Sequence, residues 1–171
     1  QLIDMGLDDV SMEVVGDFDA MYIEGLRLFR KFGKCATIKV PCTPDGLRAC
    51  RELARDLVNV NVTLIFSPAQ AILAAKAGAK YVSPFVGSVD DNSFDGIDLV
   101  DQISDIYTIQ NIRKTEILAA SVRDVKTVSD AFGAGAHVVT MPPSILEKMY
   151  NHVLTDRGLY QFDLDWAKVK R

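Results

Sequence analysis

The chain has 171 residues, 49% of them hydrophobic, so it can bury a substantial core as one domain. Its formal net charge of -4 argues against nucleic acid as a partner, and no stretch approaches the roughly 20 apolar residues of a membrane span. The three cysteines lack metal-ligand spacing, which favours reduced thiols in a cytoplasmic protein without a metal site.

Apolar periodicity predicts strands and helices in regular alternation along the chain. The first strand is expected at 10–16, and Asp17 or Asp19 can cap a helix that extends to about residue 32. Proline directly after Thr43 and after Ser67 indicates two further helix starts, because proline fits the first helical position. The other expected strands are 37–43, 58–66, 80–86, 116–122 and 137–141. The other expected helices are 44–57, 69–77, 96–109, 124–132, 145–150 and 155–170, the last capped by Thr155.

Six strands that each precede a helix require a parallel sheet, either doubly wound or closed as a (β/α)8 barrel. A dinucleotide-binding sheet would carry G-x-G-x-x-G after an early strand, whereas the Gly-Ala-Gly-Ala segment at 133–136 precedes a strand. Polar residues near the ends of several strands favour the barrel, whose active sites lie there. We therefore expect an α/β fold of the TIM-type (β/α)8 class. Residues 1–171 would form a single domain with six units, strands 3 to 8, lacking the first two.

One lysine lies in a segment that otherwise predicts a buried strand. Lys39 is flanked by Ile38 and Val40. Desolvation among apolar side chains disfavours the charged ammonium and favours a neutral amine, which can attack a carbonyl. A strand lysine more commonly reaches water or pairs with an acid. The segment by itself leaves both alternatives open.

Five motifs resemble those of the transaldolase family, in particular its short subfamily of small transaldolases and fructose-6-phosphate aldolases. They follow one another in the family's order, from about Val10 to the C-terminus. The motifs are IKVPxT at 38–43, NVTLIFS at 61–67, YVSPFVG at 81–87, AASVR at 119–123 and LTDxGL at 154–159.

The resemblance implies a barrel whose fourth strand carries Lys39 as the amine that forms a Schiff base. It implies transfer of a dihydroxyacetone unit between sugar phosphates in the pentose phosphate pathway, without a metal or organic cofactor. The substrates implied are fructose 6-phosphate, erythrose 4-phosphate, sedoheptulose 7-phosphate and glyceraldehyde 3-phosphate. No nucleic acid or membrane partner is implied.

The matched positions also imply roles for individual side chains. Glu13 and Thr63 are expected to be catalytic residues together with Lys39, because they match positions at which the family holds a water molecule. The expected substrate-binding residues hydrogen-bond the sugar or line the site, and Ser121 and Arg123 match a phosphate-binding pair. These substrate-binding residues are Asn61, Ser83, Phe85, Ser121 and Arg123.

Three positions bear on the reaction itself. Glu13 stands where the related aldolases carry Gln, and Phe85 where they carry Tyr, so group transfer is expected rather than release of free dihydroxyacetone. A fructose-6-phosphate aldolase that releases dihydroxyacetone is the alternative. Ser88 replaces an arginine that is usual in the family, which should weaken phosphate binding by about 1.5 to 3 kcal/mol.

Two expectations concern the remainder of the family fold. The family's first strand supplies an acid-base aspartate, and nothing around Asp4, Asp8 or Asp9 resembles it, so the 171-residue chain alone is expected to lack that group. An inactive barrel fragment is therefore another alternative. The subfamily forms rings of subunits, which implies a homo-oligomer with residues 155–171 as a terminal helix on a neighbouring subunit.

Overall fold

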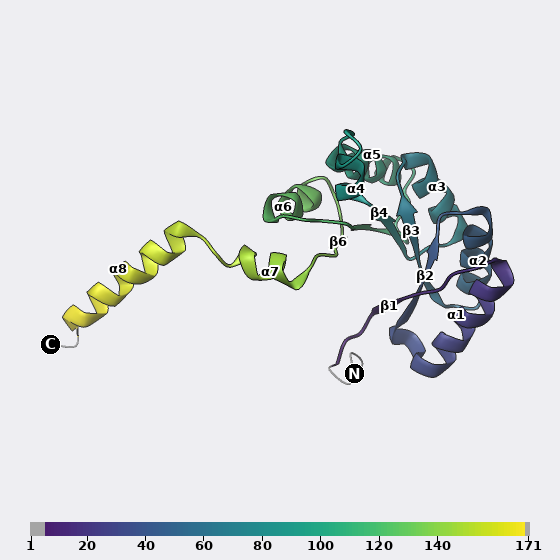
Figure 1. Ribbon diagram of the computed structural model, residues 1–171, viewed down its shortest axis with the longest axis horizontal. Coiled ribbons are helices and arrows are strands. Elements are labelled where there is room, and N and C mark those ends of the chain that lie inside the picture. Colours follow the sequence, from purple (N-terminus) through teal and green to yellow (C-terminus); the bar gives the residue numbers. More distant parts are fainter. Residues whose placement is uncertain (1–5, 170–171) are drawn as a thin grey trace.

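The computed structural model describes residues 6–169, which form an α/β fold around a six-stranded parallel sheet (Figure 1). The strands are β1 (Val10–Glu13), β2 (Ala36–Pro41), β3 (Asn59–Ile65), β4 (Tyr81–Pro84), β5 (Glu116–Ala119) and β6 (Val138–Val139). The helices are α1 (Phe18–Phe32), α2 (Pro44–Arg55), α3 (Pro68–Ala77), α4 (Val86–Asp90), α5 (Gly96–Ile109), α6 (Val125–Gly133), α7 (Pro143–Met149) and α8 (Val153–Val169), with a 3-10 turn, η2 (Gly33–Cys35), after α1.

The sheet is wound in one direction. Its strands pair in chain order from β1 to β6, and every pair is parallel. A doubly wound sheet would reverse this order at a switch point, so that alternative is wrong. The sheet curls as a half barrel, with α1, α2, α3 and α5 on its outer side (Figure 1). The α/β class and the parallel sheet are thus confirmed, while closure into an eight-unit barrel stays a prediction.

Residues of alternating strand positions build the core between the sheet and the outer helices. Ile38 and Val40 of β2 are fully buried there, together with Leu53 of α2. Helix α1 approaches this core at Gly25, where an added Cβ would lie 3.1 Å from the Leu53 methyl groups and 3.2 Å from Ile38. A side chain at position 25 would therefore push α1 away from the sheet.

The cap-then-proline segments begin two helices as expected. Thr43 Oγ1 accepts a hydrogen bond from the Gly46 N–H at 3.1 Å, and Ser67 Oγ accepts one from the Gln70 N–H at 3.3 Å. Each hydroxyl satisfies an N–H group that has no partner within its helix. Helices α2 and α3 consequently start directly after β2 and β3 and leave short loops at the carboxyl edge of the sheet.

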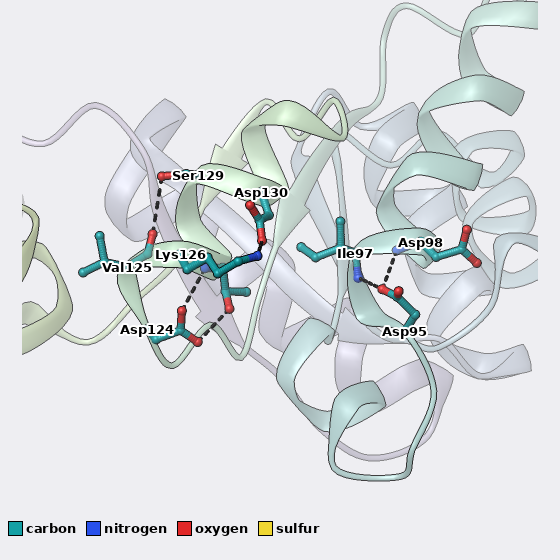
Figure 2. Close-up of polar contacts among 9 residues, drawn as sticks. Asp95, Ile97, Asp98, Asp124, Val125, Lys126, Ser129 and Asp130 are labelled. Carbon is teal, nitrogen blue, oxygen red and sulfur yellow. Dashed lines mark hydrogen bonds and ion pairs between the residues drawn. The ribbon is translucent and has the colours of Figure 1, made fainter.

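Two aspartates cap the helices that flank β5, as Figure 2 shows. Asp95 Oδ1 accepts hydrogen bonds from the N–H groups of Ile97 at 3.0 Å and Asp98 at 2.9 Å at the start of α5. Asp124 Oδ1 accepts from the Thr127 N–H at 2.9 Å at the start of α6, which confirms the expected cap.

Of the two capping candidates for α1, Asp17 is confirmed, since the Ala20 N–H donates to Asp17 Oδ1 at 2.9 Å. Other element ends differ from expectation. The last helix begins at Val153, so Thr155 lies inside it and is not its cap. The segment between the expected strand at 80–86 and the expected helix at 96–109 contains the short helix α4, because Val86 and Val89, three residues apart, are both buried.

Asp9 joins the amino ends of β1 and β4. Its carboxylate accepts hydrogen bonds from Lys80 Nζ at 2.7 Å and from the Tyr81 hydroxyl at 3.0 Å. Partial burial would raise the pKa of Asp9, but these hydrogen bonds outweigh it and hold that pKa below the ordinary value of 3.8. Asp9 precedes β1, at the opposite end of the strand from Glu13, so it lies away from the carboxyl edge of the sheet. Asp4 lies outside the described residues.

We expect Asp9→Asn to lower the free energy of unfolding by about 1 kcal/mol at pH 7, because it leaves Lys80 without its counter-charge. The folded-state pKa of Asp9 is lowered. Its contribution is therefore present above the unfolded-state pKa of about 3.9 and is lost as pH falls through the folded value. Urea unfolding at pH 6 and at pH 3 should show the wild-type advantage shrinking at the lower pH.

The control is Asp130→Asn, which breaks the exposed ion pair with Lys126 on α6. It should leave the free energy of unfolding unchanged, because an ion pair this exposed is screened by water and salt. An advantage of Asp9 that stays constant between the two pH values would contradict this account.

Candidate active site

A cavity of about 290 Å³ lies on the inner face of the sheet, toward the carboxyl ends of the strands. Every strand, or the residues directly after it, contributes to the walls. The lining residues are Ser11, Lys39, Asn61, Thr63, Ser83, Phe85, Leu118, Ala120, Ser121 and Thr140. This is the edge at which barrel enzymes place their active sites.

A larger hollow of about 490 Å³ lies between the start of α3 and the segment that joins α4 to α5. Phe66, Phe94 and Leu99 are among its lining residues, and its lining holds no amine, imidazole or thiol. Size alone would favour this hollow, but the smaller cavity holds the only lysine in either lining. The smaller cavity is therefore the better candidate for covalent chemistry.

Lys39 lies beside Glu13 across the β1–β2 pair. The two residues are register partners, and Lys39 Nζ is 3.3 Å from Glu13 Oε2. The lysine side chain is 26% exposed and the glutamate 56%. Lys39 thus meets the second description of its segment, pairing with an acid, and its side chain also lines the cavity. Such a part-exposed pair is weak, so the Lys39 side chain can leave Glu13.

A chain of hydrogen bonds crosses the inner face next to Lys39. The Ser83 hydroxyl donates to Asn61 Oδ1 at 2.7 Å, and Asn61 Nδ2 donates to Ser11 Oγ at 3.3 Å. Asn61 and Ser83 are buried, so their polar groups are held in one arrangement by each other. The site therefore has a rigid polar wall built by β1, β3 and β4.

Thr63 presents a buried hydroxyl to the same cavity. Its side chain is 1% exposed, and Oγ1 has no hydrogen-bond partner among the described residues. A buried polar group left in this state costs about 1–3 kcal/mol. Thr63 lies two residues after Asn61 and shares its face of β3. Its hydroxyl is thus available to a ligand or a water molecule in the cavity.

Two residues beside the cavity adopt a left-handed backbone that side chains disfavour. Leu64 has φ 58° and interrupts the β3–β4 register, and Ser121 has φ 60° at the turn after β5. Each costs about 1–2 kcal/mol relative to an ordinary conformation. Strain of this kind concentrates at functional sites, where the surrounding structure holds it in place. Leu57, Ser93 and Asn111 adopt the same backbone and do not line the cavity, so this strain alone does not identify the site.

Arg123 lies beside the cavity and not within its lining. It shares a second hollow with Ser121, and the Ser121 hydroxyl lies 3.3 Å from that of Ser88. Both terminal N–H groups of Arg123 donate to the Asp91 carboxylate. This ion pair raises the pKa of Arg123 and lowers that of Asp91. The guanidinium of Arg123, which is the expected phosphate-binding group, is therefore bound to a carboxylate of the chain itself.

The structure brings most of the predicted site residues together. Six of them line the cavity, Glu13 adjoins it through Lys39, and Arg123 adjoins it through Ser121. The six are Lys39, Asn61, Thr63, Ser83, Phe85 and Ser121. Among residues 6–169, none of those that line the cavity is acidic.

Sequence reasoning missed three residues. Ser11 had a signal, since it precedes Glu13 by two and so shares its face of β1. Thr140 directly follows the last strand, which is also a usual place for site residues. Asp91 had no such signal, because its partner Arg123 is 32 residues away in the chain.

Two classes of feature are absent from residues 6–169. No group of three or more His, Cys, Asp or Glu side chains is placed there to hold a metal ion. Within the same range, no helix is long and apolar enough to cross a membrane.

Comparison with known proteins bears directly on this site. The family model described as Transaldolase/Fructose-6-phosphate aldolase matches residues 3–170. The chain is 55% identical over 163 residues to a probable transaldolase of Nitrosopumilus maritimus, covering 95% of this chain and 73% of that protein. It is 51% identical over 173 residues to a probable transaldolase of Paracoccus denitrificans, covering 99% and 77%. The chain belongs to the transaldolase/fructose-6-phosphate aldolase family.

Solved structures show a more distant similarity. A mandelate oxidase structure superposes with a TM-score of 0.58 at 13% sequence identity, covering 78% of this chain and 49% of that one. A second mandelate oxidase structure gives 0.57 at 15% identity. At this level of identity the similarity concerns the fold alone.

Proposed function

We propose that the protein is a transaldolase that transfers a dihydroxyacetone unit between sugar phosphates through a Schiff base on Lys39, in the pentose phosphate pathway. The observation that carries this proposal is the position of Lys39. Its amine lines a cavity whose other polar groups are hydroxyls and an amide, with one carboxylate 3.3 Å away. Family membership and the relatives named probable transaldolase support it.

The chemistry follows from an amine and a neighbouring acid. The Lys39 amine attacks the ketose carbonyl, and loss of water from the adduct leaves an iminium. As the carbon-carbon bond of the ketose breaks, the hydroxyl on the departing carbon gives its proton to a base and becomes the aldehyde of the released aldose, while the iminium accepts the electron pair and becomes an enamine. The bound three-carbon unit then adds to a second aldehyde, and water releases the new ketose. In this proposal Glu13 accepts and returns protons in the steps at nitrogen, which the contact between its Oε2 and Lys39 Nζ supports.

The rest of the cavity suits the three-carbon unit. Asn61, Ser83 and Ser11 offer a row of hydrogen-bonding groups for its hydroxyls. Thr63 Oγ1, which has no partner among the described residues, suits a water molecule needed for hydrolysis. Fructose 6-phosphate and sedoheptulose 7-phosphate would be donors, with glyceraldehyde 3-phosphate and erythrose 4-phosphate as acceptors.

Trapping the iminium tests the role of Lys39. Borohydride reduction of the full chain with fructose 6-phosphate should leave a covalent adduct that peptide mass spectrometry places on Lys39. Lys39→Arg should form no adduct and lose roughly 10⁴-fold or more of the transfer rate.

Lys80→Arg is the matched control, because Lys80 pairs with Asp9 at the other end of the sheet. The Lys80→Arg variant should be labelled on Lys39, as the wild type is. A folded wild-type protein that is labelled elsewhere or not at all would contradict the proposal and favour an inactive barrel fragment.

The alternative is an aldolase that releases free dihydroxyacetone, and Phe85 argues against it. The Phe85 ring lines the cavity and packs edge-on against Phe66, with centroids 5.8 Å apart. It carries no proton to donate to the three-carbon intermediate. That intermediate should therefore persist until an acceptor aldehyde arrives.

Phe85→Tyr should raise the release of dihydroxyacetone without acceptor by roughly tenfold, because a phenol at this position can protonate the intermediate. An enzymatic assay of dihydroxyacetone, with and without erythrose 4-phosphate, measures the change. Phe66→Tyr is the control, since Phe66 does not line this cavity, and it should leave release unchanged. Equal turnover by the wild type with and without acceptor would identify an aldolase.

The terminal helix supports a further part of the proposal, a homo-oligomer. Helix α8 stands apart from the sheet (Figure 1). Leu159, Phe162 and Val169 are each more than half exposed and, at spacings of three and seven, share one face of the helix. We propose that this face packs on a neighbouring subunit, with residues 170 and 171 outside the described part.

Deletion of residues 153–171 should reduce the particle mass in light scattering to that of one chain, because it removes this apolar face. Leu73→Ser, which changes an exposed apolar residue on α3, should leave the assembly intact. A full-length chain that is already monomeric at micromolar concentration would contradict the proposed assembly.

A further inference from the structure

The carboxylate that holds Arg123 has a consequence for phosphate binding. Asp91 directly follows α4, and its two oxygens each accept one terminal N–H of the Arg123 guanidinium. A phosphate group can use this same edge of the guanidinium, since guanidinium binds carboxylate and phosphate with the same planar fork. Asp91 and a phosphate would therefore compete for Arg123.

The position of the guanidinium places this competition at the cavity. A Cβ added to Gly87 would lie 3.0 Å from Arg123 Nε and 2.2 Å from the Ser121 carbonyl oxygen. Arg123 thus lies against the first turn of α4, next to the hydroxyl pair of Ser88 and Ser121. The two hydroxyls and the guanidinium form one polar patch, and Asp91 occupies its charged part.

The charge balance of this patch is unfavourable for a dianion. Arg123 is the cation, Asp91 neutralises it, and Asp90 adds a second carboxylate that also acts on Arg123. Asp90 itself accepts a hydrogen bond from the Gly96 N–H at 2.8 Å, which keeps its carboxylate in place. A phosphate that approached an unchanged patch would meet two negative charges against one positive charge.

We propose that Asp91 is an internal competitor at the phosphate subsite, so that the substrate phosphate binds Arg123 by exchange with the Asp91 carboxylate. Exchange is feasible because the side chains of Arg123 and Asp91 are 55% and 51% exposed, and exposed ion pairs of this kind are weak. The inference deepens the proposed function and depends on it in one respect, namely that the phosphate of the sugar lies at Ser121 and Arg123. Asp91 then sets how tightly the phosphate end of the sugar is held.

Asp91→Asn tests the exchange, with inorganic phosphate as the probe. The amide keeps the shape of the side chain and removes its charge, so the dissociation constant of phosphate should fall about three- to tenfold at low ionic strength. Phosphorus NMR titration of the full chain measures this change. The gain should diminish in about 0.5 M salt, because exposed charges are then screened. With sugar phosphates, KM should fall while kcat stays constant.

Two controls isolate the effect. Asp130→Asn removes a carboxylate from a similar exposed ion pair, the one with Lys126 on α6 (Figure 2). This variant should leave phosphate affinity unchanged. In an Arg123→Gln background, Asp91→Asn should give no gain, since the contested donors are gone. Thermal unfolding of each variant shows that it is folded before it is titrated.

The outcomes separate this inference from the proposed reaction. Phosphate affinity that is equal or lower in Asp91→Asn, or not measurable in either protein, would overturn the exchange and make Asp91 an orienting residue or a bystander. Borohydride trapping on Lys39 can succeed in that case, and the transaldolase proposal would stand. Tighter phosphate binding by the variant without any Lys39 adduct would support exchange and contradict the proposed chemistry.

Discussion

The site depends on the strict alternation of β2. Ile38 and Val40 are both fully buried against the outer helices, and a strand that buries these two residues must turn the one between them to the inner face. Lys39 therefore reaches the cavity because its neighbours anchor the core. A slip of one residue in the β2 register would bury the lysine and expose both apolar side chains, which makes the correct register strongly favoured.

Parallel pairing extends this constraint to the neighbouring strands. The same register that sets Lys39 on the inner face places Glu13 next to it on β1 and Asn61 next to it on β3. The hydrogen bond from Ser83 to Asn61 then carries the polar wall onto β4. One periodic pattern thus arranges an amine, an acid and an amide without help from loops. The left-handed backbone of Leu64 appears only past this wall, where the β3 register breaks.

The features that could be predicted from sequence are those that depend on residues close together in the chain. Alternation and capping residues locate the strands and most helix starts, and residues two apart on a strand, such as Asn61 and Thr63, can be assigned to one face. The α4 helix was missed because its five residues contain no polar cap, and its helical turn becomes evident only from the joint burial of Val86 and Val89. The Asp91 contact was missed because it depends on how the loops after β4 and β5 meet in space.

Two cations lie at or beside the cavity, and each is paired with an acid. Lys39 is paired with Glu13 and Arg123 with Asp91, and in each pair the acid comes from a different element than the cation. Both pairs are part-exposed, so each cation keeps a defined position without being strongly bound. In the proposed reaction, a substrate with a carbonyl at one end and a phosphate at the other would react with the Lys39 amine and bind the Arg123 guanidinium, which would free both carboxylates. Under the proposed function, the two ion pairs would lie where the carbonyl and phosphate ends of the substrate bind, and each pair would open on binding.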